Sequence, residues 1–401
     1  MSDFRRYWIG EALSNLGTRT GNIAYPLLAL ALTHSAALAG VLAFSRSAAW
    51  FVLALPAGAL IDRLDRKKLM VICDLASALV LATVVVSLAL HELTYAQLLT
   101  VAVVQGVFVV FFSLSESGAV RHLVADDDLP GAIAQNTARN SAAWLAGPPL
   151  GGVLYAVQRS LPFAADVVSY LASAAMLLSI RKPFHKARER EPWSARAHTR
   201  EIREGVAWIW RQPFVRAAAL IVGGANFMSN AGSLLMIIVA RDRGASAPMI
   251  GFMMSAAAVG SLGGAIAATR LHRVFSPRAI VVTYPWLGAA AMLVLVFRQP
   301  PLAMGAIFGV WVFFGPTWDA IVEGRRLLLT PDEMQGRASS VVYLFALGGA
   351  ALGPLVGGVL VTGFGGSEAF LAVGVFGVLL ASAATLAPGL REMGQAASYP
   401  A

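Results

Sequence analysis

Four polar side chains stand on one face of the first long apolar stretch of the chain. Glu11, Asn15, Arg19 and Asn22 are spaced by four, four and three residues, the spacing of neighbours on an α-helix. A carboxylate, two amides and a guanidinium in one row can bind polar groups of a ligand or exchange a proton. Because polar groups inside an apolar helix are costly unless they face a cavity or a partner, we expect this row to line a cavity.

Three arginines lie deep within apolar stretches, namely Arg19, Arg46 and Arg139. They suit an anionic or phenolic ligand, since a guanidinium donates hydrogen bonds in a fixed fork. The equal alternative is that they pair with Glu11, Glu116 or backbone carbonyls and hold the helices together. Both interpretations stay open at the level of sequence.

Acidic groups in the same stretches are candidates for carrying protons, since a carboxyl buried away from water can be neutral near physiological pH. These candidates are Glu11, Glu116 and Asp166. Asp74 and Asp319 stand within about two turns of a helix end. We interpret these two as ordinary interfacial charges.

Aromatic and amide side chains complete a predicted ligand cavity of adaptable apolar character. Most aromatic residues of a helical bundle face lipid or neighbouring helices, so only a minority is expected to touch a ligand. The full set of cavity candidates is Asn15, Arg19, Asn22, Arg46, Trp50, Phe112, Arg139, Asn226, Asn230 and Tyr343.

Residues for enzymatic chemistry do not form a recognisable set. The six histidines fall mostly in loops or near the ends of apolar stretches, Cys73 is the only cysteine, and no phosphate-binding loop is present. The sequence therefore predicts no enzyme, no metal site, no cofactor and no bound nucleotide.

The elements that must position these residues are long apolar segments. Hydrophobic residues make up 57% of the 401 residues and charged residues 13%, whereas soluble domains average about 45–50% and roughly 25%. Segments of about 20 apolar residues span a bilayer as helices that satisfy their own backbone hydrogen bonds, while barrel strands would alternate. We predict an all-α integral membrane protein with twelve transmembrane helices. The spans are 8–32, 36–61, 69–90, 95–118, 131–157, 161–181, 214–240, 248–269, 278–297, 301–322, 337–362 and 368–389.

Lysine and arginine are distributed unevenly among the short loops. With the N-terminus placed in the cytoplasm, the inner segments hold 23 basic residues and the outer loops hold four, which is the bias that sets orientation. Both termini are therefore predicted to be cytoplasmic. The formal net charge of +9 follows from this bias and from contact with anionic membrane lipid. It predicts no nucleic-acid partner.

An internal repeat divides the chain into two halves. A shift of 206 residues brings the sequence GPPLGG at 147–152 onto GPLVGG at 353–358, and it also brings Gly58 onto Gly264. We therefore expect two pseudo-symmetric bundles of six helices. The predicted domains are residues 1–181, a cytoplasmic linker at 182–213, and residues 214–401 with a short cytoplasmic tail.

The segment after the second span carries a dense charge pattern. Residues 58–67 read GALIDRLDRK, which resembles the G-x-L-x-D-R-x-x-R-K motif of the major facilitator superfamily. This resemblance implies a central cavity and alternating access by rocking of two bundles. An acid beside several bases can form charge-assisted bonds across the ends of neighbouring helices and break them as the bundles tilt; the alternative is a loop whose bases only fix topology. The predicted cytoplasmic gate comprises Gly58, Asp62, Arg63, Arg66 and Lys67.

Small residues recur every four positions in the fifth and eleventh spans, next to a proline. Such faces let helices approach closely, and proline bends a helix. The pattern resembles the antiporter motif of facilitator drug exporters, although Ala143 replaces its first glycine. The resemblance favours export, and the alternative is a packing role without direction. The motif comprises Gly147, Pro148, Gly151, Gly152, Gly353, Pro354, Gly357 and Gly358.

Nearly the whole chain resembles the branch of the superfamily that contains macrolide efflux proteins and the enterobactin exporter, for example in DVVSY at 166–170 and PDEMQGR at 331–337. The resemblance implies a multi-pass protein of a bacterial plasma or inner membrane. We expect it to work as a monomer and to export a small amphiphilic compound, such as an antibiotic or a siderophore, in exchange for protons. Thr18 stands where many relatives have aspartate, so proton coupling is not carried over to that position. An importer or a flippase for a lipid-like substrate is the first alternative, and a non-transporting receptor is the second.

Overall fold

The structure is a computed structural model that describes residues 3–61, 64–182, 184, 203 and 206–391. Over this part of the chain the elements are helices, and no strand is assigned. The all-α fold predicted from the apolar segments is confirmed.

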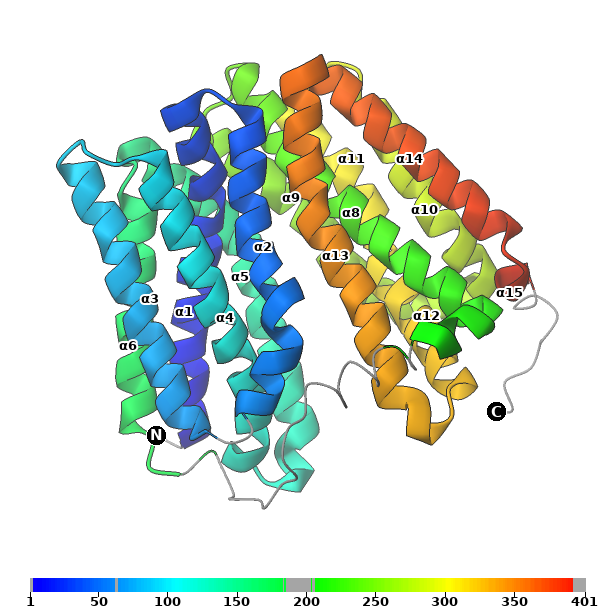
Figure 1. Ribbon diagram of the computed structural model, residues 1–401, viewed down its shortest axis with the longest axis horizontal. Helices are drawn as coiled ribbons and strands as arrows, with labels where there is room; N and C mark the ends of the chain where they lie inside the picture. Colours follow the sequence, from blue (N-terminus) through cyan, green and yellow to red (C-terminus); the bar gives the residue numbers. More distant parts are fainter. Residues whose placement is uncertain (1–2, 62–63, 183, 185–202, 204–205, 392–401) are drawn as a thin grey trace. The chain divides into compact units, whose positions relative to one another are not determined.

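The first half of the chain folds into six long helices (Figure 1). They are α1 (Asp3–Thr33), α2 (Ala36–Ile61), α3 (Arg66–Ala89), α4 (Tyr95–Leu123), α5 (Leu129–Val157) and α6 (Leu161–Ser179), with the short 3-10 helix η1 (Asp126–Asp128) before α5.

The second half repeats this pattern with one interruption. Its helices are α8 (Pro213–Asp242), α9 (Ala247–Val274), α10 (Pro277–Leu295), α11 (Pro301–Phe313), α12 (Gly315–Leu329), α13 (Asp332–Phe364), α14 (Gly366–Leu386) and the short α15 (Pro388–Arg391). The predicted span 301–322 is split at Phe314, because Pro316 lacks the amide that would continue the helical ladder. Together α11 and α12 still form one apolar segment, Pro301–Leu329.

Polar residues mark the ends of several helices. The side chain of Asp65 accepts a hydrogen bond from the amide of Lys68 at the start of α3, and Thr94 and Ser276 do the same for α4 and α10. These caps satisfy amides that have no partner inside the helix. Gly365 separates α13 from α14 with a φ of 99°, a left-handed conformation that glycine adopts without strain.

Ten of the segments are long and apolar enough to cross a membrane. Among the twelve predicted spans, α1 and α5 fall short of this measure. They are also the helices that carry Glu11, Arg19 and Arg139, so their lower hydropathy reflects the polar residues that the sequence analysis singled out.

The chain divides into two compact units. The first comprises Met1–Glu191 with Ala240–Ser255, and the second comprises Pro192–Val239 with Ala256–Ala401. The predicted linker, 182–213, lies mostly outside the described residues, although 206–211 are helical. The predicted domain boundaries stay a prediction.

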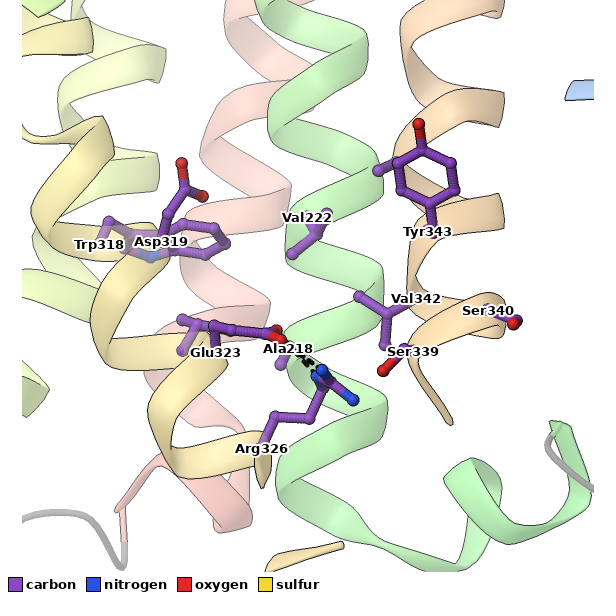
Figure 2. Close-up of a pocket in the computed structure, with 12 residues that line it drawn as sticks. Ala218, Val222, Trp318, Asp319, Glu323, Arg326, Ser339, Ser340, Val342 and Tyr343 are labelled. Atoms are coloured by element: carbon purple, nitrogen blue, oxygen red, sulfur yellow. Dashed lines mark hydrogen bonds and ion pairs between the residues drawn. The ribbon is translucent and has the colours of Figure 1, made fainter. Parts of the chain in front are cut away.

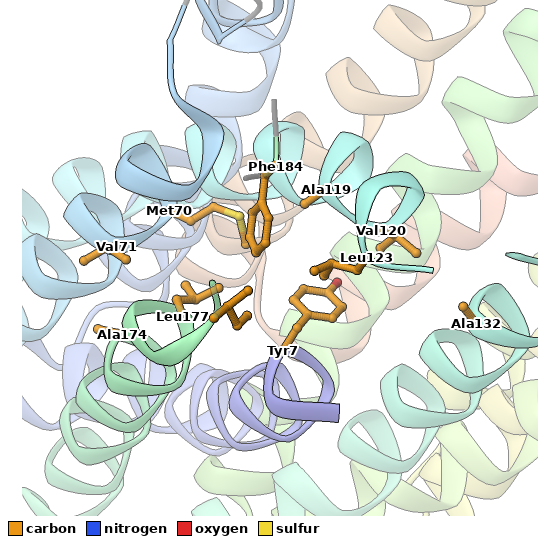
Figure 3. Packing of buried hydrophobic residues seen from close by; sticks show 11 residues of the cluster. Tyr7, Met70, Val71, Ala119, Val120, Leu123, Ala132, Ala174, Leu177 and Phe184 are labelled. Carbon is orange, nitrogen blue, oxygen red and sulfur yellow. The ribbon is translucent and has the colours of Figure 1, made fainter. Parts of the chain in front are cut away.

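A cluster of buried apolar residues closes one end of the first unit (Figure 3). Tyr7 of α1, Met70 of α3, Leu123 of α4 and Leu177 of α6 meet there around Phe184. Because the ends of four helices contribute to it, this cluster fixes the spacing of the helices at that end of the unit.

The glycine motifs bring two helices together in each half. A Cβ on Gly147 of α5 would lie 2.3 Å from the Cβ of Arg19 on α1, and one on Gly353 of α13 would lie 2.4 Å from the carbonyl of Phe227 on α8. Gly151 and Gly349 make equally close approaches to Thr20 and Gly223. The same contact, between the fifth and first helices of a half, thus occurs twice. This geometry is what small-residue faces in membrane helices produce.

Candidate functional site

A cavity of about 170 Å³ lies inside the first unit, between α1, α3, α4 and α6. The polar row of α1 reaches it through Glu11, Asn15 and Arg19, and Phe112 of α4 forms part of its wall. Asn22 lies farther along α1 and is not part of this lining. Three of the four residues in the predicted row therefore face one cavity.

The best-paired charge in this region is Arg139 of α5. Its Nη2 lies 2.9 Å from Oε1 of Glu116 on α4, and the hydroxyl of Tyr7 donates to the same oxygen at 2.7 Å. Arg139 is 5% exposed. A guanidinium buried this deeply needs such a counter-ion. Arg139 therefore has the carboxylate partner that one of the two open interpretations offered.

An amide chain links this ion pair to the cavity. Oδ1 of Asn140 accepts from Nε and Nη2 of Arg139, both at 3.3 Å, and from Nδ2 of Asn15 at 2.7 Å. Arg19 donates through Nε to Oδ1 of Asn15 at 3.4 Å, and its guanidinium lies 3.8 Å from the ring centroid of Trp144. We call Glu116, Arg139, Asn140, Asn15 and Arg19 the polar chain. It crosses from α4 through α5 to α1.

Arg46 of α2 has a separate environment. Its Nη2 donates to Oδ1 of Asn22 at 2.9 Å, and its guanidinium lies 4.3 Å from the ring centroid of Tyr25. Tyr25 in turn donates to Oε1 of Gln105 on α4 at 2.8 Å. Arg46 is thus held by an amide and an aromatic face, and not by the Glu11 or Glu116 that one of the two open interpretations offered as partners.

Asp166 of α6 is 2% exposed and is held by hydroxyl groups. Its Oδ1 accepts from Thr18 at 3.2 Å and from Ser169 at 3.3 Å. Gly17 lets α6 approach this part of α1, since a Cβ there would lie 2.1 Å from the hydroxyl of Ser169. Thr18, noted as a departure from the family pattern, thus supplies a donor to a buried acid on another helix.

Asp74 differs from its interpretation as an interfacial charge. It is 1% exposed and lines the same cavity as Glu11. Met70, Cys73, Ser77 and Leu81 of α3 are buried beside it. Their spacing of three to four residues places Asp74 on the inward face of the helix, and this signal was available in the sequence.

The predicted gate is described in part, because Asp62 and Arg63 lie outside the described residues. Lys67 donates through Nζ to the carbonyl of Ile180 at 2.6 Å, at the end of α6. Arg66 contacts α4, since a Cβ on Gly118 would collide with its guanidinium. The two described bases of the motif therefore contact the ends of two neighbouring helices.

A larger cavity, of about 520 Å³, lies inside the second unit between α8, α12 and α13 (Figure 2). Its walls are mostly apolar, with Val222, Trp318 and Tyr343 among them, and Asp319 projects into it. In the described part of the chain, Asp319 has no ion pair or hydrogen bond. The cavity therefore combines aromatic walls with one unneutralised acid.

Glu323 and Arg326 form an ion pair at the edge of this cavity (Figure 2). Nε of Arg326 donates to Oε2 of Glu323 at 2.8 Å. Sequence reasoning did not single out either residue. The signal was the spacing of Asp319, Glu323 and Arg326 by four and three residues, which is one helical face.

The other predicted cavity residues lie elsewhere. Asn226 and Asn230 donate to carbonyls of their own helix, those of Val222 at 3.0 Å and Asn226 at 2.9 Å. Trp50 packs against an apolar cluster that α2 shares with α4. These three do not line either cavity.

Comparison with known proteins places this geometry in a family. The chain matches a family described as "Transmembrane secretion effector" over residues 1–401. It is 25% identical over 379 residues to the multidrug efflux pump Tap of Mycolicibacterium fortuitum, covering 92% of each chain. It is also 24% identical over 367 residues to the enterobactin exporter EntS of Shigella boydii, covering 82% of this chain and 86% of the relative.

Solved structures of transporters share the fold. A bacterial homolog of the human lysosomal transporter Spinster superposes with a TM-score of 0.74 at 14% identity, over 99% of this chain and 98% of the other. A bacterial homologue of the iron transporter ferroportin gives 0.70 at 15% identity, over 95% and 98%. At these identities the likeness concerns the fold alone.

Proposed function

This chain belongs to the major facilitator superfamily, in its family of transmembrane secretion effectors, and on that premise we propose that it exports a small amphiphilic compound in exchange for protons. It is a multi-pass membrane transporter, and the prediction that it is not an enzyme is confirmed by this membership. Direction, substrate and coupling are the parts that we propose.

The observation that carries the proposal is the polar chain between α4, α5 and α1. A buried ion pair inside a membrane bundle is costly to maintain and is typical of transport pathways. Here the pair connects through Asn140 and Asn15 to Arg19, which lines a cavity. A change of charge in the cavity, next to Arg19 on α1, can therefore affect α5 and α4 through these hydrogen bonds.

The cavity of the second unit supports an amphiphilic substrate. A volume of about 520 Å³ is within the range of drug-sized ligand pockets. Its apolar and aromatic walls suit a ring system or an alkyl group, while Asp319 offers one point for a polar or charged group.

Export is supported by the glycine-proline motifs and by the names of two relatives. The motifs around Pro148 and Pro354 resemble those of antiporters, and both relatives are named for efflux. We propose that Asp62, with Arg63, Arg66 and Lys67, forms a gate that closes and opens as the substrate passes. Asp62→Asn should then slow turnover while binding is retained.

A growth screen identifies the substrate. The chain is expressed in a sensitive bacterium and tested against a panel of antibiotics and siderophores, with an Asp62→Asn strain as the matched control. Protection by the native chain that the variant lacks supports export. Increased sensitivity indicates uptake, which is what an importer predicts.

Reconstitution then tests the coupling. Proteoliposomes are loaded with the compound found in the screen, and a pH gradient is imposed. Efflux that follows the gradient supports proton exchange, and efflux indifferent to it contradicts that part of the proposal. If the native chain, Arg19→Ala and Arg46→Ala all give only the flux of liposomes without protein, a non-transporting receptor is favoured.

A further inference from the structure

Two buried acids of the first unit stand apart from the polar chain. Glu11 on α1 and Asp74 on α3 line one cavity and are 4% and 1% exposed. Oε1 of Glu11 and Oδ2 of Asp74 are buried and make no hydrogen bond in the described part of the structure. Ser173 of α6 is also buried, and its hydroxyl likewise makes no hydrogen bond in the described part of the structure. The two acids therefore line one cavity, in a region where α6 packs against both α1 and α3.

The charges around this pair do not neutralise it. Glu116 of α4 and Asp74 place like charge near Glu11, and the one cation that acts on Glu11, Arg139 of α5, is already ion-paired with Glu116. The charged groups that act on Asp74 are Asp166 of α6 and Glu116, both acidic. An ionised carboxylate in this place would lack both water and a counter-ion, and buried groups in that situation take up a proton instead.

We propose that Glu11 and Asp74 form a two-carboxyl site that binds the exchanged proton. Two carboxylates that line one cavity and are both buried without a counter-ion of their own cannot both be ionised at low cost, so the site holds a proton while it is closed to water. The inference rests on the proposed proton-driven export, to which it adds the place where the proton is held.

The other buried acids have hydrogen-bond donors or a cation as partners. Glu116 has Arg139 and the hydroxyl of Tyr7. Asp166 has the hydroxyls of Thr18 and Ser169, and Arg46 acts on it as a cation. The sequence alone did not rank the three candidates for carrying protons, Glu11, Glu116 and Asp166. The contacts select Glu11 among them and add Asp74.

The polar chain connects this proton site to the residues that line the cavity. When Glu11 loses its proton, a second negative charge stands beside Arg139, which then has two carboxylates to pair with. A shift of Arg139 toward Glu11 weakens its bonds to Glu116 and Asn140. Asn140 holds Asn15, and Asn15 holds Arg19 at the cavity. Binding and release of one proton thus alter the groups that a substrate would meet.

Carbodiimide labelling tests the site without any substrate. Dicyclohexylcarbodiimide reacts with protonated carboxyls in apolar surroundings, and the purified full-length chain is treated in detergent across a pH series and mapped by mass spectrometry. We expect labelling at Glu11 or Asp74 that is lost as the pH rises. Glu116, whose carboxylate is paired with Arg139, serves as the internal control and stays unlabelled.

Two variants decide whether the acids act as a pair. In Asp74→Asn, labelling of Glu11 at a given pH should decrease, because the like charge that favours its protonated form is gone, and Glu11→Gln should do the same to Asp74. Absence of label from both residues, equal label on Glu116, or single variants that leave the remaining acid unchanged would each overturn the proposal. Because labelling needs no transport, a chain that exports nothing can still confirm the proton site.

Discussion

The guanidinium of Arg139 is almost fully shielded, with a side chain 3% exposed, whereas the side chain of Glu116 keeps 22% of its surface open. This difference makes the two halves of the ion pair unequal. Removing the carboxylate leaves a cation that water cannot reach, while removing the arginine leaves an acid that can meet water or a proton.

We therefore expect Glu116→Gln to lower the free energy of unfolding more than Arg139→Gln, by about 3 kcal/mol against about 1–2 kcal/mol. The double variant should lose less than the sum of the two. Titration of the purified protein with a denaturing detergent, followed by tryptophan fluorescence, measures all three. Additive losses would mean that the two side chains do not stabilise each other.

Asp319 is the residue that should set the charge preference of the second cavity. Asp319→Asn keeps the shape of the side chain but removes its charge, so binding of a cationic amphiphile should weaken about tenfold, which corresponds to about 1.4 kcal/mol. A neutral analogue of the same size should bind unchanged. Asp332→Asn, at the exposed start of α13, is the matched control, and fluorescence titration of both probes gives the affinities. An equal loss of affinity for the cationic and the neutral probe would show that Asp319 affects the shape of the cavity and does not select for charge.

At the scale of elements, the close contacts of α5 with α1 and of α13 with α8 depend on glycine. Gly147→Ala and Gly353→Ala should each destabilise the protein by about 1–3 kcal/mol, because the added carbon would force the helices apart. Gly131→Ala in the same helix as Gly147 is the control, since nothing lies within 4 Å of its added carbon and alanine favours a helix. Detergent melting curves compare the three. A neutral Gly147→Ala would show that α1 and α5 can separate freely.

The end of α6 depends on Lys67, a lysine of the gate motif that lies in the first turn of α3. Lys67→Ala removes the bonds from Nζ to the carbonyls of Ile180 and Leu178, and a charge-assisted bond at a helix C-terminus contributes about 1 kcal/mol. Lys68→Ala is the matched control, because the side chain of Lys68 is 81% exposed. We expect a lower melting temperature and slower export for the first variant alone. If the two variants have the same melting temperature and export rate, Lys67 contributes only to the orientation of the chain in the membrane.

At the scale of the whole molecule, hydropathy was enough to predict the ten segments that are long and apolar enough to cross a membrane, because each must hold about 20 apolar residues. The helices α1 and α5, which carry buried polar residues, fall short of this measure. The repeat predicted the division of the spans into two similar sets, and the recurring α1 with α5 and α8 with α13 contacts agree with it. The break between α11 and α12 was not predicted, since a proline near a helix middle can bend a span as well as divide it.

The partners of the charged groups were harder to predict than the helices. Spacing showed that Glu11, Asn15 and Arg19 share a face, but which helix they meet depends on long-range packing. Arg139 and Glu116 are 23 residues apart in sequence, and no local pattern pairs them. Asp74 lies on the buried face of α3 although it is within about two turns of the helix end, so its distance from that end alone did not predict its environment.

Coupling is the property that involves the whole transporter, and Glu11→Gln should separate it from substrate movement. A glutamine keeps the shape of the side chain but neither gains nor loses a proton, so export against a concentration gradient should disappear. Exchange of labelled for unlabelled substrate across the membrane needs no net proton movement and should persist. Proteoliposomes with and without a pH gradient measure both rates, with Asp332→Asn as the control. If Glu11→Gln still concentrates substrate in response to the gradient, the proton is carried elsewhere; if exchange is lost as well, Glu11 serves the conformational cycle itself.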